Sequence, residues 1–108
     1  MSEELRELSR LLVRCRGWRW MPGMADLWGG RVREGDGIDR IQALPDLTDP
    51  ATLGCLLALV RDAWGDPYLC CVGDRETGWR LDGYAAVEDI HSYSSEAEAL
   101  FVALRAAP

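Results

Sequence analysis

Residues 49–65, DPATLGCLLALVRDAWG, carry the strongest structural signal in the chain. Asp49 offers a side-chain acceptor for an N-cap, and Pro50 follows at the first helical position, where its missing N–H leaves no hydrogen bond unmade. Apolar side chains recur at helical spacing up to Gly65 and form one stripe: Leu53, Leu56, Leu57, Val60 and Trp64. Two more apolar residues, Cys55 and Leu59, lie beside the stripe. The pattern predicts a helix that is buried on more than one side.

Two further helices are expected, one on each side of this segment. The first covers about Ser2–Arg16, where leucines recur at helical spacing and acidic residues fill the first turn. The second covers about Ser95–Ala106, where Ser95 and Glu98 fit a capping box before an apolar face. Both begin with a serine whose hydroxyl can accept a backbone N–H, and Gly17 can end the first of them.

Strand candidates lie between the helices. Residues 68–72 and 79–81 flank a polar turn and predict a hairpin. A weaker hairpin is expected between 27–33 and 38–43, and residues 85–87 fit either another strand or an ordered loop. The order predicts one α+β domain over residues 1–108, with about three helices packed on an antiparallel sheet of about four strands, in the order α-ββ-α-ββ-α.

The charge is unevenly distributed along the chain. All twelve basic residues are arginine and the net charge is −6. Residues 1–33 hold seven arginines against four acids (+3), whereas residues 34–108 hold five against fourteen (−9). An acidic majority argues against general nucleic-acid binding and suits a basic partner. Because the chain begins without a hydrophobic signal region and has no apolar run of membrane-spanning length, we expect a cytoplasmic protein.

The chain offers little for catalysis. It has one histidine, His91, and no nucleophile-elbow, Walker, zincin or Rossmann pattern. Four cysteines lack C-x-x-C spacing and are expected to be structural thiols: Cys15, Cys55, Cys70 and Cys71. We therefore expect neither a metal nor a cofactor, and a binding protein rather than an enzyme. A hydroxyl or thiol paired with His91 would make a small enzyme the third alternative.

The segment 14–24, RCRGWRWMPGM, interleaves arginine with tryptophan. It continues a basic stripe on the first predicted helix, formed by Arg6, Arg10 and Arg14. Planar guanidinium groups and indole rings are suited to a nucleotide, which gives a candidate ligand site: Arg16, Trp18, Arg19 and Trp20. The competing interpretation is a core element, with both tryptophans on one buried face and the arginines as an exposed fringe.

Acidic residues form the other candidate surface. They could complement the basic channel of a nuclease or a CRISPR effector and speed association with it. The candidates for partner binding are Asp36, Asp39, Asp46, Asp74, Glu76 and Asp82. A second copy of the chain is also expected as a partner if the central helix exposes one of its apolar sides.

Three blocks of the sequence carry a resemblance: residues 17–24, 44–61 and 95–100. They are similar to short uncharacterised proteins of tailed bacteriophages and their prophage relatives in GC-rich bacteria. The resemblance implies a phage origin and assigns no functional residue. Small phage accessory proteins often act by stoichiometric binding, so we expect an anti-CRISPR-like inhibitor of a host defence or nucleic-acid-processing protein. The alternative is a binder that sequesters a nucleotide signal through residues 14–24.

Overall fold

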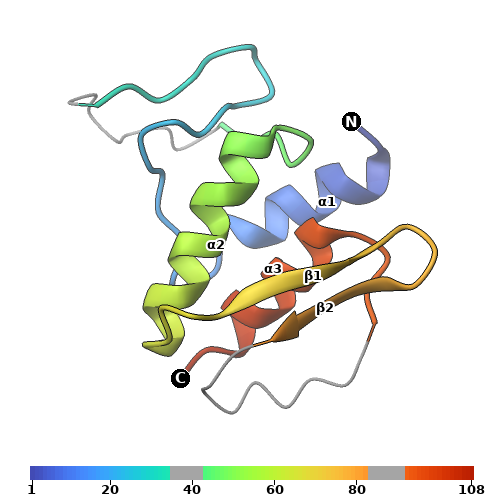
Figure 1. Cartoon of the computed structure of the whole chain (residues 1–108). Helices are drawn as coiled ribbons and strands as arrows, with labels where there is room; N and C mark the ends of the chain where they lie inside the picture. Colours follow the sequence, from blue (N-terminus) through green and yellow to red (C-terminus); the bar gives the residue numbers. More distant parts are fainter. Residues whose placement is uncertain (35–42, 83–91) are drawn as a thin grey trace.

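The computed structural model describes residues 1–34, 43–82 and 92–108 (Figure 1). It has the predicted α+β class, with three helices beside a small antiparallel sheet. The described elements, in chain order, are α1 (Glu3–Leu12), α2 (Pro50–Trp64), β1 (Cys70–Asp74), β2 (Gly78–Asp82) and α3 (Glu96–Ala106).

Each helix begins at the predicted cap. The hydroxyl of Ser2 accepts the N–H of Leu5 at 3.2 Å, and the hydroxyl of Ser95 accepts the N–H of Glu98 at 3.1 Å. Asp49 caps α2, which ends at Gly65 in the left-handed conformation (φ 63°). These contacts satisfy backbone groups that a helix end leaves unpaired, which is why capping residues predicted the boundaries well.

Helix α1 is shorter than predicted because the chain tightens after Leu12. The N–H groups of Arg14 and Cys15 bond to carbonyls three residues back, at 3.2 and 3.0 Å, instead of four. Gly17 then passes close to α3: a Cβ atom there would lie 2.8 Å from Leu104 Cδ1. The backbone turns under α3 at this point rather than continuing the helix to Arg16.

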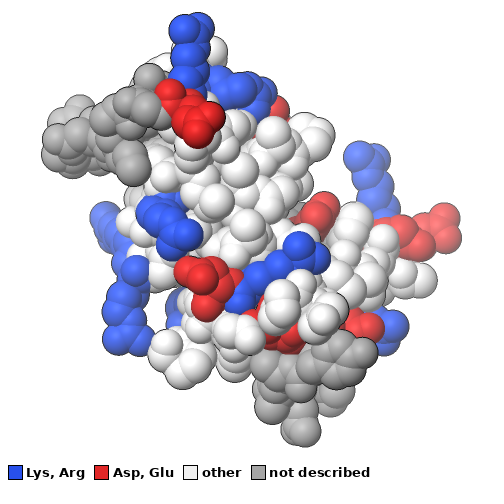
Figure 2. Space-filling view, turned by 60° about the vertical axis from the view of Figure 1, so that its left-hand side comes forward, with Lys and Arg blue, Asp and Glu red and all other residues white. Residues whose placement is uncertain are grey.

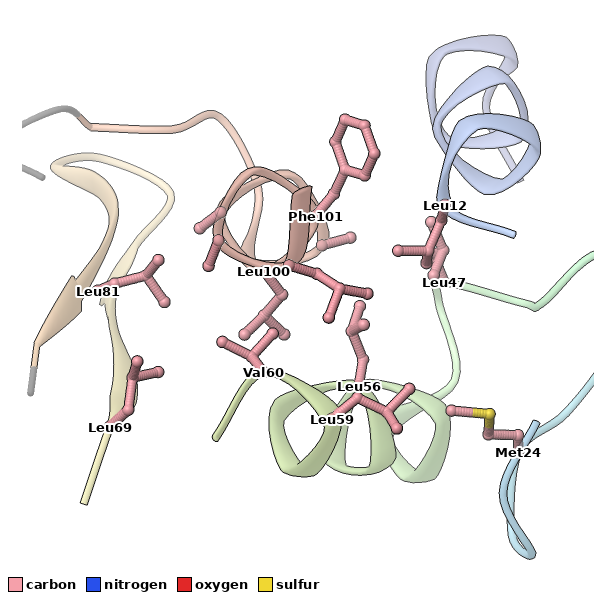
Figure 3. Packing of buried hydrophobic residues seen from close by; sticks show 14 of the residues in the cluster. Leu12, Met24, Leu47, Leu56, Leu59, Val60, Leu69, Leu81, Leu100 and Phe101 are labelled. Atoms are coloured by element: carbon pink, nitrogen blue, oxygen red, sulfur yellow. The ribbon is translucent and has the colours of Figure 1, made fainter. Parts of the chain in front are cut away.

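Helix α3 lies at the centre of the core, in contact with α1, α2 and both strands (Figures 1 and 3). Its buried side chains face Leu56, Leu59 and Val60 of α2, so the buried face of α2 includes Leu59, which the sequence places beside the predicted stripe. Leu69 and Leu81 close the core on the hairpin side. No large apolar side chain of α2 is among the exposed ones, so this helix gives no reason to expect a second copy. The oligomeric state stays a prediction.

The sheet has two strands in the described residues, not about four. The stronger hairpin is confirmed, with Cys71 opposite Leu81 and Val72 opposite Arg80. The weaker hairpin is not formed as predicted: within the described part of residues 27–33 the chain makes a turn, closed by a bridge between Ala25 and Arg31. Gly29, with φ at 87°, reverses the chain inside the expected strand. Residues 38–42 and 85–87 lie outside the described residues.

Candidate functional site

Of the six acidic residues expected to bind a partner, the four that the structure describes do not form one site. Asp36 and Asp39 lie outside the described residues. Asp46 accepts the N–H of Thr48 at 3.0 Å, and Asp74 accepts the N–H groups of Glu76 and Thr77 at 2.8 and 2.7 Å. The hydrogen bonds from the Thr77 backbone, and then its hydroxyl, lower the pKa of Asp74. Both aspartates therefore hold local turns, a sufficient structural reason for their presence.

The four described acids are also spread over the surface. Asp74 pairs with Gly78 at one end of the hairpin, and Asp82 pairs with Cys70 at the other. At the usual rise of about 3.3 Å per residue, the two ends of these five-residue strands are about 13 Å apart. Asp46 precedes α2, a separate element. Acidic and basic side chains are interspersed on an uncharged background over the face in Figure 2.

The Arg/Trp segment is divided between core and surface. Trp20 is buried, with 6% of its surface exposed, and Trp18 is half-buried. Their rings meet edge to face, with centroids 5.4 Å apart. Arg19 is exposed and pairs with Asp62 at 3.6 Å. Arg16 lines a cavity to which the other three candidates do not contribute. The structure thus places the two tryptophans together and does not bring the four candidates to one site.

The cavity beside Arg16 has a volume of about 570 Å³. It lies where the C-terminal ends of α1 and α3 come together, and Phe101 and Leu104 form part of its apolar lining. Arg14 and Arg105 are also at its edge. Arg105 gives no functional signal in the sequence, because an arginine in the last turn of a helix is normally explained by the helix dipole.

Among the residues that the structure describes, Trp28 is the most exposed large apolar side chain, at 79%. It lies in a turn built around Asp26, which is only 7% exposed. One carboxylate oxygen of Asp26 accepts the N–H groups of both Trp28 and Gly30 at 2.9 Å, while the backbone N–H of Asp26 donates to the carbonyl of Gly30 at 2.9 Å. A Cβ atom at Gly30 would lie 2.8 Å from Asp26 Oδ2, so a larger residue there would displace the carboxylate that holds the turn. We call residues 26–30 the Trp28 turn.

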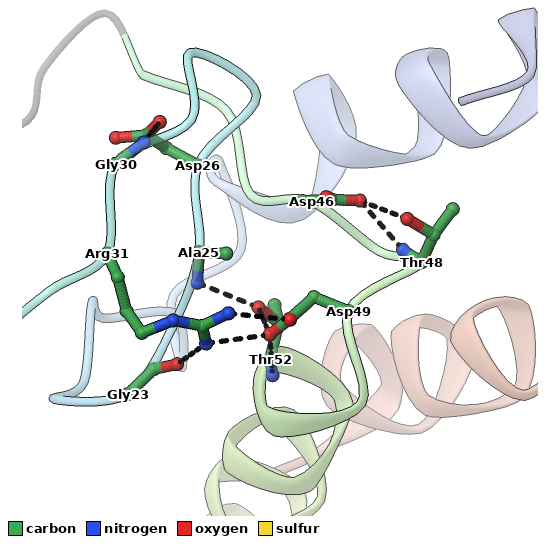
Figure 4. A network of polar contacts seen from close by, with 9 residues as sticks. All are labelled: Gly23, Ala25, Asp26, Gly30, Arg31, Asp46, Thr48, Asp49 and Thr52. Atoms are coloured by element: carbon green, nitrogen blue, oxygen red, sulfur yellow. Dashed lines mark hydrogen bonds and ion pairs between the residues drawn. The ribbon is translucent and has the colours of Figure 1, made fainter.

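A chain of polar contacts fastens this turn to the start of α2 (Figure 4). The N–H of Ala25 donates to the hydroxyl of Thr52 at 2.9 Å, and that hydroxyl donates to Asp49 at 2.9 Å. Arg31 donates to Asp49 at 2.8 and 3.0 Å and to the carbonyl of Gly23 at 2.6 Å. We call Gly23, Ala25, Arg31, Asp49 and Thr52 the cap network.

Electrostatics within the cap network favours a charged carboxylate. The hydrogen bond from Arg31 holds the pKa of Asp49 well below its usual range, against the opposing effect of burial. The backbone and hydroxyl hydrogen bonds from Thr52 act in the same direction as Arg31. The pKa of Arg31 is raised in turn, first by its hydrogen bond to Asp49. Charge-assisted hydrogen bonds between Arg31 and Asp49 therefore hold the Trp28 turn against the start of α2.

Sequence reasoning missed both Trp28 and Thr52. The pair Gly29-Gly30 is typical of a turn, but the strand expected over residues 27–33 runs through it, so the two expectations conflict and neither points to Trp28. Thr52 gave no signal, because a threonine in the first turn of a helix is unremarkable until its partner Ala25 is known.

Three of the four thiols lie where burial disfavours the reactive thiolate form. All four are free and half-buried. Burial raises the pKa of Cys15 and Cys55, and raises that of Cys71 to about 11. A raised pKa disfavours the thiolate that nucleophilic chemistry needs. His91, the residue on which the enzyme alternative depends, lies outside the described residues.

Two kinds of feature are absent from the described residues: a metal-ligand cluster and a membrane-spanning helix. These residues contain no group of three or more side chains able to hold a metal ion, and none of their helices combines the length and apolarity needed to cross a bilayer. Comparisons of the whole chain with protein families, curated proteins and solved structures give no match. The function has to be argued from the surface of this chain alone.

Proposed function

We propose that this protein acts by stoichiometric binding to a protein partner, with Trp28 as the anchor of the interface. The observation that carries the proposal is the combination of a tryptophan exposed at 79% with a turn whose backbone is fixed by a buried aspartate. Single exposed apolar residues are common on protein surfaces and by themselves indicate nothing. Trp28 differs from such residues because the backbone of its turn is held by the hydrogen bonds of Asp26.

The rigidity of the Trp28 turn and the size of the tryptophan side chain both favour Trp28 as the anchor of an interface. Tryptophan is among the residues that most often dominate binding energy at interfaces. Burying its side chain removes about 150–250 Å² from water, worth roughly 4–6 kcal/mol before the costs of association are subtracted. Because the Trp28 turn is already ordered by Asp26, little backbone entropy is lost when a partner covers it.

Charge supplies the second part of the proposal. The net charge of −6 favours a basic partner, such as the nucleic-acid channel of a nuclease or of a CRISPR effector. Since the described acids are dispersed, their contribution is to steer the encounter rather than to form a local contact. A host defence protein as the partner, and hence an inhibitor as the class of function, follows only if the expected resemblance of three sequence blocks to phage accessory proteins reflects a phage origin.

The test is a quantitative interaction experiment. The tagged protein is incubated with host lysate, partners retained at near-equimolar amount are identified, and the affinity for each purified partner is measured. Trp28→Ala should weaken the true complex at least about thirtyfold, the loss typical of an interface hot spot. Tyr68→Ala is the matched control, since this aromatic ring is 70% exposed at the other end of α2.

Two results would contradict the proposal. One is the absence of any equimolar partner. The other is a purified complex whose dissociation constant changes by less than about twofold in Trp28→Ala, since an anchor must cost far more than that. A partner bound as tightly by Trp28→Ala as by the parent protein would place the interface elsewhere.

A further inference from the structure

The cavity at the converging ends of α1 and α3 is independent of the Trp28 turn. Its volume of about 570 Å³ is within the range of small-molecule sites. Six of its lining residues matter for recognition, three cationic and three apolar: Arg14, Arg16, Arg105, Leu11, Phe101 and Leu104. No aspartate or glutamate is among the described residues that line it.

The number of arginines exceeds what the helix ends require. Each helix C-terminus carries a partial charge of about −0.5, so the two ends together need about one cation. Three guanidinium groups leave an excess of about +2, or about +1 when a carboxylate at Pro108 is counted. In the described part of the chain, Arg14 and Arg16 form no salt bridge. This is a local positive excess in a protein whose net charge is −6.

The third arginine is already oriented. The guanidinium carbon of Arg105 lies 4.9 Å from the centroid of the Phe101 ring, a cation–π contact. This contact restrains the exposed Arg105 side chain, so less side-chain entropy is lost when its planar donor fork binds an anion. Guanidinium groups bind phosphate through paired N–H donors, and the apolar lining offers a surface for an uncharged ring.

The geometry points to a binding site for a small organic phosphate that carries an aromatic or apolar body, with a nucleoside monophosphate as the representative ligand. The arginines contact the phosphate, and Leu11, which is 41% exposed, offers the larger apolar contact to the base, since only 5% of Phe101 and 3% of Leu104 are exposed. The site differs from the one expected from sequence, because Trp18, Arg19 and Trp20 do not line the cavity.

The experiment is calorimetric titration of the protein with AMP, adenosine and pyrophosphate. AMP should bind at least about tenfold more tightly than either of the other two, because only AMP supplies both the charge and the apolar body. Cys15 lines the cavity and serves as a reporter: saturating AMP should slow its alkylation several-fold relative to Cys70, which lies in β1.

Two pairs of variants separate the site from general charge effects. Leu11→Glu places an acid in the cavity at an exposed position and should weaken AMP binding at least about tenfold, whereas Leu11→Gln should weaken it less than about threefold. Arg14→Gln with Arg16→Gln should weaken it similarly, while Arg75→Gln with Arg80→Gln on the hairpin should not. Circular dichroism and melting confirm that each variant folds.

Three outcomes would overturn the inference. Pyrophosphate binding as tight as AMP binding would mean that the arginines attract any polyanion and the apolar lining is not used. AMP binding that survives Leu11→Glu and the Arg14/Arg16 substitutions would place the ligand elsewhere. The third outcome is that millimolar AMP gives no heat of binding and does not protect Cys15 from alkylation. The arginines would then only neutralise the helix ends, and the cavity would not be a binding site.

Discussion

The two halves of the molecule are held by different forces. The region formed by α2, α3 and the hairpin is held by apolar side chains, with Leu56 and Leu100 fully buried between the two helices. The region from residue 23 to 34 has no helix or strand of its own: Met24 and Val32 anchor it in the core, and polar contacts to α2 hold the backbone that carries the turn. The first region explains why the protein folds, and the second explains how it presents a rigid turn to solvent.

The core and the Trp28 turn also differ in how they use tryptophan. Trp20 is 6% exposed and packs against Trp18 beside the core, whereas Trp28 is 79% exposed eight positions later. The same side chain therefore serves stability in one place and is available for binding in the other. Substitutions that separate stability from binding are the way to test this contrast.

The largest effect is expected in the apolar half, from Leu100→Ala. Leu100 has no exposed surface and lies in α3, which contacts every other described element except the turns. Removing a fully buried leucine side chain leaves a cavity and costs about 3–5 kcal/mol of unfolding free energy. Urea denaturation measures it, with Leu11→Ala as the control, because Leu11 is 41% exposed on α1. Equal losses in both variants would mean that α3 is not the centre of the core.

A smaller loss is expected in the polar half, from Thr52→Val. Valine keeps the shape of threonine but removes the hydroxyl that accepts the N–H of Ala25 and donates to Asp49. Leaving a buried N–H without a partner costs about 1–3 kcal/mol. Thr52→Ser retains the hydroxyl and should recover most of that loss in urea denaturation. If serine is no more stable than valine, the hydroxyl does not hold the turn to α2.

The difference between the halves also explains what the sequence could predict. The apolar half is encoded by short-range patterns: caps at Ser2, Asp49 and Ser95, and helical spacing between them. These patterns fixed three helices and one hairpin. The cap network joins residues as far apart as Ala25 and Thr52, whose pairing exists only after the chain has folded. The fold class was therefore predictable, whereas the Trp28 turn and the arginine cavity were not.

The cap network should also make stability depend on acid. In the unfolded chain Asp49 takes up a proton near its ordinary pKa of about 3.9, but in the folded protein Arg31 keeps it ionised to lower pH. Below about pH 4 the unfolded state binds more protons, so the free energy of unfolding falls as the pH falls. Asp49→Asn should lower stability at neutral pH, and its difference from the parent protein should shrink in acid. A difference that stays constant from about pH 7 to about pH 2 would show that the charge of Asp49 has no part in the support.

The smallest change in stability, and the sharpest test of the contrast, is expected from Trp28→Ala. Because the side chain is mostly exposed and the turn is held through backbone N–H groups, its removal should change the free energy of unfolding by less than about 0.5 kcal/mol. Asp26→Ala is the complementary variant: Trp28 is kept, but the turn loses the acceptor for two N–H groups. If the interface needs a rigid anchor, both variants weaken partner binding, one by removing the anchor and the other by loosening it. Binding that is lost in Trp28→Ala and retained in Asp26→Ala would mean that the tryptophan acts without its support.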